Sequence, residues 1–120
     1  MSLSELTGFA DEASALLKAM GNKHRFLALC YLADGELSVG QLEARLGLSQ
    51  SALSQHLAKL RRDRLVRTRR DRQTIYYMLR GREAVEILRT ILTCYRQQPP
   101  TSANDDGDGD DARGGQLARR

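Results

Sequence analysis

The chain has 120 residues, of which 41% are hydrophobic and 28% charged, with 19 basic against 15 acidic side chains. This length suits one hydrophobic core and is short for two, so we expect one globular domain over residues 1–97 and a tail over residues 98–120. The longest apolar run, FLALCYLA at 26–33, is far shorter than the roughly 18 residues that span a bilayer, and the N-terminus lacks a signal-peptide pattern. We therefore expect a cytoplasmic protein with no membrane partner.

The positive charge is concentrated in one segment. Residues 98–120 contain five aspartates and three arginines, so residues 1–97 retain 16 basic and 10 acidic side chains, a net charge of +6. Residues 59–72 alone contain eight basic and two acidic side chains. Such a cluster favours a polyanionic partner, and nucleic acid is favoured over a membrane because no accompanying helix offers a large apolar face to lipid. The acidic, glycine-rich composition of residues 98–120 predicts a disordered tail.

Two helices are predicted before residue 34. The first runs from Ser4, the expected N-cap, to Met20, with Gly21 as its stop signal. Its apolar residues recur at helical spacing: Leu6, Phe9, Ala13, Leu16, Leu17 and Met20. The second covers about residues 22–33 and has a wide apolar face, which predicts a central position in the core.

The next segment has the sequence form of a helix-turn-helix. Ser38 and Gln41 have the spacing of a capping box at the start of a short helix. A turn at residues 47–48 follows, and Ser49 is expected to cap a second helix over residues 49–63. The residues predicted to face inward from the two helices are Val39, Leu42, Leu46, Leu53, Leu57 and Leu60.

The pattern changes after residue 63. LVRTRR and TIYYMLR are short stretches rich in β-branched and aromatic residues, and the polar DRQ lies between them, which predicts a β-hairpin over residues 65–80. A last helix is predicted over residues 82–97, with Val85, Leu88, Ile91, Leu92 and Tyr95 on one side. The predicted fold is therefore mainly α with a β-hairpin wing, a winged helix-turn-helix.

The second helix of this motif carries polar side chains opposite its leucines. An α-helix fits the major groove of B-DNA, where amide and hydroxyl side chains near its N-terminus can read base edges. The expected contacts to bases are Gln50, Ser51, Ser54 and Gln55, with His56 on a base or a phosphate. Lys59, Arg61 and Arg62 are expected at phosphates, and the hairpin residues Arg69, Arg70, Arg72 and Gln73 at the adjacent minor groove. For any one of these residues a merely solvated position is the alternative.

The stretch LSVGQLEARLGLSQSALSQHLAKLRRDRLVRTRRDRQTIYYML, residues 37–79, resembles the core of the ArsR/SmtB family of bacterial winged-helix repressors, in which LSQSALSQHLAKLR and QTIYY are near-consensus. The resemblance covers about residues 12–97. It implies a homodimer joined through the first and last helices, which addresses a two-fold symmetric operator in double-stranded DNA. The apolar stripes of these two helices fit such a dimer face, although periodicity alone also allows ordinary core.

Members of this family usually sense metals, but the ligand patterns implied by the resemblance are absent. The helix before the second helix of the motif reads VGQLEARLG and contains no cysteine, and REAVEILRTILTCYRQ in the last helix contains no histidine. We therefore expect no metal site and no cofactor.

The resemblance narrows to the dithiol branch of the family, whose members respond to reactive sulfur species or oxidants. It implies that Cys30 and Cys94 are the paired sensor thiols, whose oxidation or persulfide linkage lowers affinity for the operator. Both cysteines have apolar neighbours, so structural cysteines in a metal-responsive or ligand-independent regulator of the same family are the alternative. An enzyme with a reactive thiol is not expected, since the sequence shows neither a Cys/His pair nor a glycine-rich phosphate loop.

Overall fold

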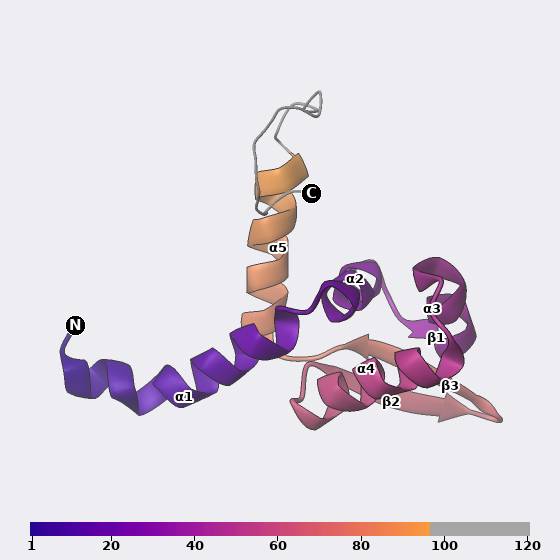
Figure 1. The fold of residues 1–120 in the computed structure, drawn as a ribbon, viewed down its shortest axis with the longest axis horizontal. Coiled ribbons are helices and arrows are strands. Elements are labelled where there is room, and N and C mark those ends of the chain that lie inside the picture. Colours follow the sequence, from indigo (N-terminus) through magenta and orange to yellow (C-terminus); the bar gives the residue numbers. More distant parts are fainter. Residues whose placement is uncertain (97–120) are drawn as a thin grey trace. The chain divides into compact units, whose positions relative to one another are not determined.

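The computed structural model describes residues 1–96 and comprises two units, Met1–Arg89 and a second unit that begins at Thr90. In chain order the elements are α1 (Leu3–Met20), α2 (Lys23–Leu32), β1 (Leu37–Ser38), α3 (Val39–Leu46), α4 (Gln50–Arg62), β2 (Val66–Asp71), β3 (Thr74–Leu79) and α5 (Arg82–Arg96) (Figure 1). The tail predicted over residues 98–120 lies outside the described residues.

The core of the first unit is built around α2 and α4. Leu29 of α2 and Leu53 and Leu60 of α4 are fully buried, and Leu57 is 2% exposed. The other buried residues are Ala19, Met20, Ala28, Leu32, Leu37, Leu42, Leu65, Val66, Ala84 and Leu88. No polar or charged residue among residues 1–96 is buried, so burial of apolar surface is what holds these elements together.

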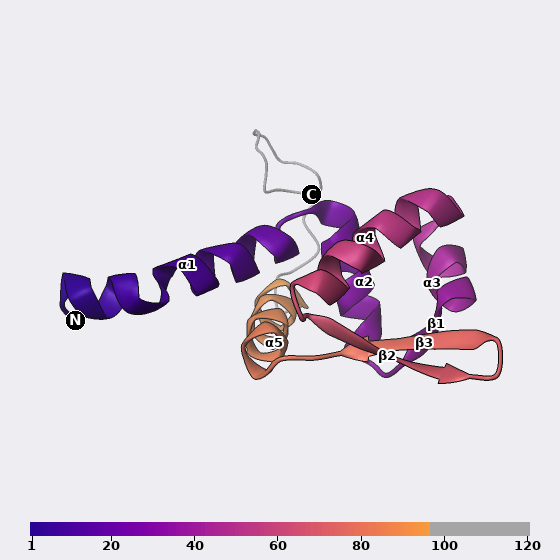
Figure 2. The ribbon, with the colours of Figure 1, turned by 90° about the horizontal axis from the view of Figure 1, so that it is seen from below.

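Most of α1 extends away from the other elements of its unit (Figures 1 and 2). Only Ala19 and Met20 at its C-terminal end are buried. The prediction that Ser4 caps this helix is wrong, because Ser2 is the N-cap and the helix begins at Leu3. The physical reason is the capping box: Ser2 accepts a hydrogen bond from the backbone N–H of Glu5, and the Glu5 carboxylate accepts one from the Ser2 N–H at 2.8 Å.

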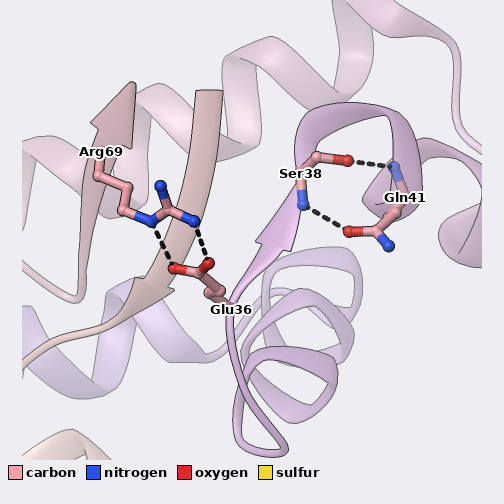
Figure 3. A network of polar contacts seen from close by, with 4 residues as sticks. All are labelled: Glu36, Ser38, Gln41 and Arg69. Atoms are coloured by element: carbon pink, nitrogen blue, oxygen red, sulfur yellow. Dashed lines mark hydrogen bonds and ion pairs between the residues drawn. The ribbon is translucent and has the colours of Figure 1, made fainter. Parts of the chain in front are cut away.

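The helix-turn-helix of α3 and α4 is confirmed, and local hydrogen bonds define its ends. The predicted capping box is present: the Gln41 N–H donates to Ser38 Oγ, and the Ser38 N–H donates to Gln41 Oε1 (Figure 3). Gly47 ends α3 with φ 66°, a left-handed conformation that costs glycine little. Ser49 then caps α4 by accepting a hydrogen bond from the Ala52 N–H.

The predicted β-hairpin is confirmed as β2 and β3, which pair antiparallel from Val66–Leu79 to Asp71–Thr74. The polar turn is shorter than predicted, because Asp71 is the last residue of β2 and only Arg72 and Gln73 connect the strands. Arg72 takes φ 61°, the left-handed conformation that two-residue hairpin turns favour.

A third strand, β1, was not predicted. It has only two residues and pairs antiparallel with β3, which gives the strand order β1-β3-β2. This pairing joins the wing to the helix-turn-helix, since Ser38 of β1 is also the N-cap of α3.

The last predicted helix is confirmed within the described residues as α5. Its first part belongs to the first unit, where Ala84 and Leu88 join the core. Ile91 and Leu92 in the second unit are half-buried, and Tyr95 is exposed.

The contribution of the Ser38 capping box to the stability of the fold can be tested by substitution. Ser38→Ala should lower the free energy of unfolding by about 1 kcal/mol, because one backbone donor of α3 loses its partner. Urea denaturation at a fixed protein concentration measures the change. Ser51→Ala, an exposed position within α4, is the matched control and should change stability by less than about 0.5 kcal/mol. Equal losses in both variants would contradict the capping role.

Candidate nucleic-acid interface

Helix α4 is divided into an apolar and a polar side. Leu53, Leu57 and Leu60 are buried in the core. The polar residues that the sequence predicted as DNA contacts are exposed on the other side: Gln50, Ser51, Ser54, Gln55, Arg61 and Arg62. The burial of the leucines therefore fixes which side chains α4 presents to solvent.

The amide and hydroxyl side chains lie on the first two turns of α4, directly after the turn from α3. These groups both donate and accept hydrogen bonds, which is the chemistry needed to read base edges in a major groove. Arg61 and Arg62 lie in the last turn, where their guanidinium groups suit phosphate oxygens.

His56 differs from its polar neighbours because it is half-buried. Its ring centroid lies 5.6 Å from that of His24 near the start of α2. Burial lowers the pKa of His56 below its ordinary value, and the charges of Arg25 and His24 lower it further. The neutral imidazole is therefore the favoured form, which suits a contact to a base or backbone group better than an ion pair with phosphate.

Lys59 is also less available to a DNA phosphate than the sequence suggested. Its ammonium group lies 2.9 Å from the carboxylate of Asp63, one turn later in sequence. Both side chains are partly exposed, so the pair is a surface ion pair of small stability. Asp63 thus offsets the positive charge of Lys59 at the C-terminal end of α4.

The hairpin supplies further basic residues. Arg70, Arg72 and Gln73 are exposed at or beside its turn. Figures 1 and 2 both show this turn at the same end of the first unit as the N-terminal end of α4. The predicted base-reading residues and the tip of the wing thus lie toward one end of the unit.

Arg69 is placed differently from Arg70 and Arg72. Its guanidinium binds the Glu36 carboxylate through two nitrogens (Figure 3). It also lies over the ring of Tyr76. The pKa of Glu36 is lowered by this hydrogen bond, so the carboxylate stays ionised. Sequence reasoning missed Glu36 and Tyr76, because nothing in the local pattern marks residues that meet Arg69 only in the folded sheet.

The two predicted sensor thiols lie on different helices. Cys30 is half-buried on α2 in the first unit, and Cys94 is exposed on α5 in the second unit. Within residues 1–96, no group of three or more histidine, cysteine, aspartate and glutamate side chains is placed to hold a metal ion. No helix in the described part of the chain is long and apolar enough to cross a membrane.

Comparison with known proteins identifies the family. A model described as "Bacterial regulatory protein, arsR family" matches residues 22–68. The transcriptional activator HlyU of Vibrio cholerae is 50% identical over 97 residues, which are 81% of this chain and 90% of that protein. This chain belongs to the arsR family. The predicted family is thus confirmed, and so is the expectation of a regulator and not an enzyme.

One further relative is similar in sequence, and two solved structures are similar in fold. The biofilm growth-associated repressor of Xylella fastidiosa is 35% identical over 98 residues, 82% of this chain and 86% of that protein. The structure of reduced HlyU from V. cholerae matches with a TM-score of 0.76 at 50% identity, over 79% of this chain and all of that one. The repressor BigR from X. fastidiosa matches with a TM-score of 0.74 at 35% identity, over 82% of this chain and all of that one.

The lowered pKa of His56 predicts that acid destabilises the fold. Below its ordinary value of 6.5, the unfolded chain binds a proton that the folded chain resists, so stability falls as the pH falls. Urea midpoints at about pH 7.5 and about pH 5.5 measure this effect, because carboxylates remain largely ionised over that range. His56→Gln should show a smaller loss than the unaltered chain. An equal loss in both would exclude His56 as the source.

Proposed function

We propose that this chain is a homodimeric transcriptional repressor that binds a two-fold symmetric operator in double-stranded DNA. We further propose that its operator affinity falls when Cys30 and Cys94 are oxidised or linked through sulfur. The observation that carries the DNA-binding part is the division of α4, whose leucines are buried while its amide and hydroxyl side chains are exposed on the first two turns.

Helix α4 has the properties of a recognition helix. The N-terminal part of such a helix meets base edges in the major groove, and Gln50, Ser54 and Gln55 are exposed there. Arg61 and Arg62 can neutralise phosphates further along. HlyU is named a transcriptional activator and BigR of X. fastidiosa a transcriptional repressor, which supports the same class of function for this chain.

Exposed apolar residues on α1 support a homodimer. Leu6 is 41% exposed and Phe9 46% exposed, and Leu3 and Leu17 are more exposed still. Large apolar side chains grouped on one helix are a common sign of an association surface. A second copy of the chain, contacting the first and last helices, would remove them from water and place two α4 helices on one DNA duplex.

The proposed switch begins at Cys94, which is the more exposed thiol and thus the more accessible nucleophile. Its thiolate attacks the outer sulfur of a low-molecular-weight persulfide, forms a Cys94 persulfide and releases the thiol. The Cys30 thiolate then attacks the inner sulfur of that persulfide, forms a disulfide and releases hydrogen sulfide. If both cysteines are first persulfidated, one persulfide attacks the other, leaving a trisulfide and again releasing hydrogen sulfide.

Linkage lowers operator affinity only if the linked form binds DNA less well than the dithiol form. We propose that a bridge between Cys30 on α2 and Cys94 on α5 restrains these two helices and so changes the spacing of the two α4 helices in the dimer. One solved relative is named reduced HlyU, a name that fits the proposal of a redox-dependent state in this chain.

Base reading by α4 can be tested with a duplex selected from a random pool by the full chain. Gln50→Ala and Ser54→Ala should each weaken binding to this duplex by about tenfold, because a lost base contact costs about 1–3 kcal/mol. Binding to an unrelated duplex of the same length should change by less than about twofold. Titrations of both duplexes at one salt concentration measure the difference.

Two controls accompany this test. Ser14→Ala, an exposed serine on α1, should leave both affinities unchanged. Arg72→Gln should weaken both duplexes alike, as expected for a phosphate contact. If Gln50→Ala and Ser54→Ala also weaken both duplexes equally, these residues do not read bases.

The thiol switch can be tested by intact-protein mass spectrometry together with a gel-shift assay on the selected duplex. Treatment with glutathione persulfide should produce chains that have lost two hydrogens, with or without one added sulfur, and should lower DNA affinity by about tenfold or more. Cys94→Ser should bind DNA as the dithiol form does and should not respond to the persulfide.

A normal response of Cys94→Ser would exclude the thiol pair as the switch. Unmodified cysteines with unchanged DNA binding would favour the alternative of structural cysteines in a metal-responsive or ligand-independent regulator. A change in DNA binding on adding Zn²⁺ would then distinguish these two.

A further inference from the structure

Arg69 of β2 contacts both Glu36 and Tyr76. Its Nε donates to Glu36 Oε1 at 2.9 Å, and a second guanidinium nitrogen donates to Glu36 Oε2. The guanidinium carbon lies 4.4 Å from the centroid of the Tyr76 ring. The planar guanidinium of arginine can bind a carboxylate through two nitrogens and stack on an aromatic ring at once, which the point charge of a lysine ammonium cannot do in the same geometry.

The contact crosses the whole sheet. Because the strand order is β1-β3-β2, β1 and β2 are not hydrogen-bonded to each other. Ser38 of β1, Tyr76 of β3 and Arg69 of β2 are aligned in register. Neighbouring strands lie about 4.8 Å apart, so the outer strands are about 10 Å apart. The Arg69 side chain lies over the Tyr76 ring of the middle strand. It reaches Glu36, two residues before Ser38 (Figure 3).

The ion pair with Glu36 connects β2 of the wing to the segment directly before α3, the first helix of the helix-turn-helix. Ser38 is the N-cap of α3 and is held by two hydrogen bonds with Gln41. A movement of β2 relative to β1 would therefore pull on the residue that begins α3. The ion pair thus adds a side-chain link between β2 and the segment before Ser38 to the backbone pairing of the sheet.

The same contact removes Arg69 from the charges available to DNA. The hydrogen bond to Glu36 raises the pKa of Arg69 and lowers that of Glu36, so the two groups stay ionised and offset each other. Arg70 and Arg72 form no ion pair within residues 1–96. These two arginines at the tip of the wing are therefore not held by an ion pair.

We propose that Arg69 is a positioning residue, which acts with Glu36 and Tyr76 to set the orientation of the wing against the helix-turn-helix, and that it does not contact DNA. This inference rests on the proposed DNA binding. It differs from the sequence-based expectation, which placed Arg69 beside Arg70 and Arg72 at the minor groove.

The variant Glu36→Gln distinguishes a positioning role of the Glu36–Arg69 pair from a simple effect of net charge on DNA binding. It raises the net charge of the chain by one, so long-range attraction alone predicts tighter binding to DNA. Loss of the bidentate pair predicts the opposite, a loss of about fivefold in affinity for the selected duplex, a small effect of the size that breaking an exposed ion pair produces. Arg69→Gln should give a similar loss, and the double variant should be no weaker than either single one.

The salt dependence of the affinity for DNA provides a second test. The dependence of log affinity on log salt concentration should keep its slope in Glu36→Gln and Arg69→Gln, because no phosphate contact is lost. Arg70→Gln is the matched control on the neighbouring residue. It should reduce the slope by about one and should be additive with Glu36→Gln.

A third measurement does not depend on DNA. Amide hydrogen exchange of β2 and β3 in the free chain should become about fivefold faster in Glu36→Gln and in Arg69→Gln, and should stay unchanged in Arg70→Gln.

If Arg69→Gln reduces the salt slope by about one while Glu36→Gln tightens binding, Arg69 is a phosphate contact and the inference is overturned. Unchanged exchange in both variants would also overturn it. Failure of the unaltered chain to bind any duplex would instead reject the proposed function, while exchange would still report whether the pair fastens the wing.

Discussion

The burial of Leu53, Leu57 and Leu60 is the constraint on which the rest of the molecule depends. These three side chains are almost fully removed from water, and each contributes about 1.5–3 kcal/mol by being buried. Because they lie on one side of α4, the helix cannot rotate about its axis without exposing them. The polar residues on its first two turns are therefore held outward in a fixed direction. A core built from leucine thus determines which chemistry the chain presents to a partner.

Polar contacts then set the positions of the elements around α4. The capping box of Ser38 begins α3, Gly47 turns the chain toward α4, and Ser49 caps α4. Each contact is worth only about 1 kcal/mol, yet together they leave one short turn between the two helices. The ion pair of Glu36 and Arg69 extends this arrangement from β1 to β2. Lys59 and Arg69 are therefore already paired with a carboxylate. The other exposed basic side chains on α4 and the hairpin are the ones available to DNA.

The features that the sequence predicted well are the local ones. The spacing of leucines every three or four residues gives both sides of α4, and a serine followed three residues later by glutamine gives the start of α3. The same rule explains the error at α1, where Ser2 has Glu5 at the third position and Ser4 has Thr7. Strand β1 and the partner of Arg69 could not be predicted, because Leu37 meets Tyr77 and Glu36 meets Arg69 only after the chain has folded. The half-burial of His56 depends in the same way on its packing near His24.

The measurement that tests the central claim most directly is hydroxyl-radical footprinting of the full chain on a duplex selected from a random pool. A dimer that places two α4 helices in successive major grooves should protect two patches, related by two-fold symmetry and about 10 base pairs apart or a multiple of that spacing. The selected sequence should be a near-palindrome across them. A single protected patch, or a pool in which no sequence is enriched, would contradict recognition of DNA by paired α4 helices.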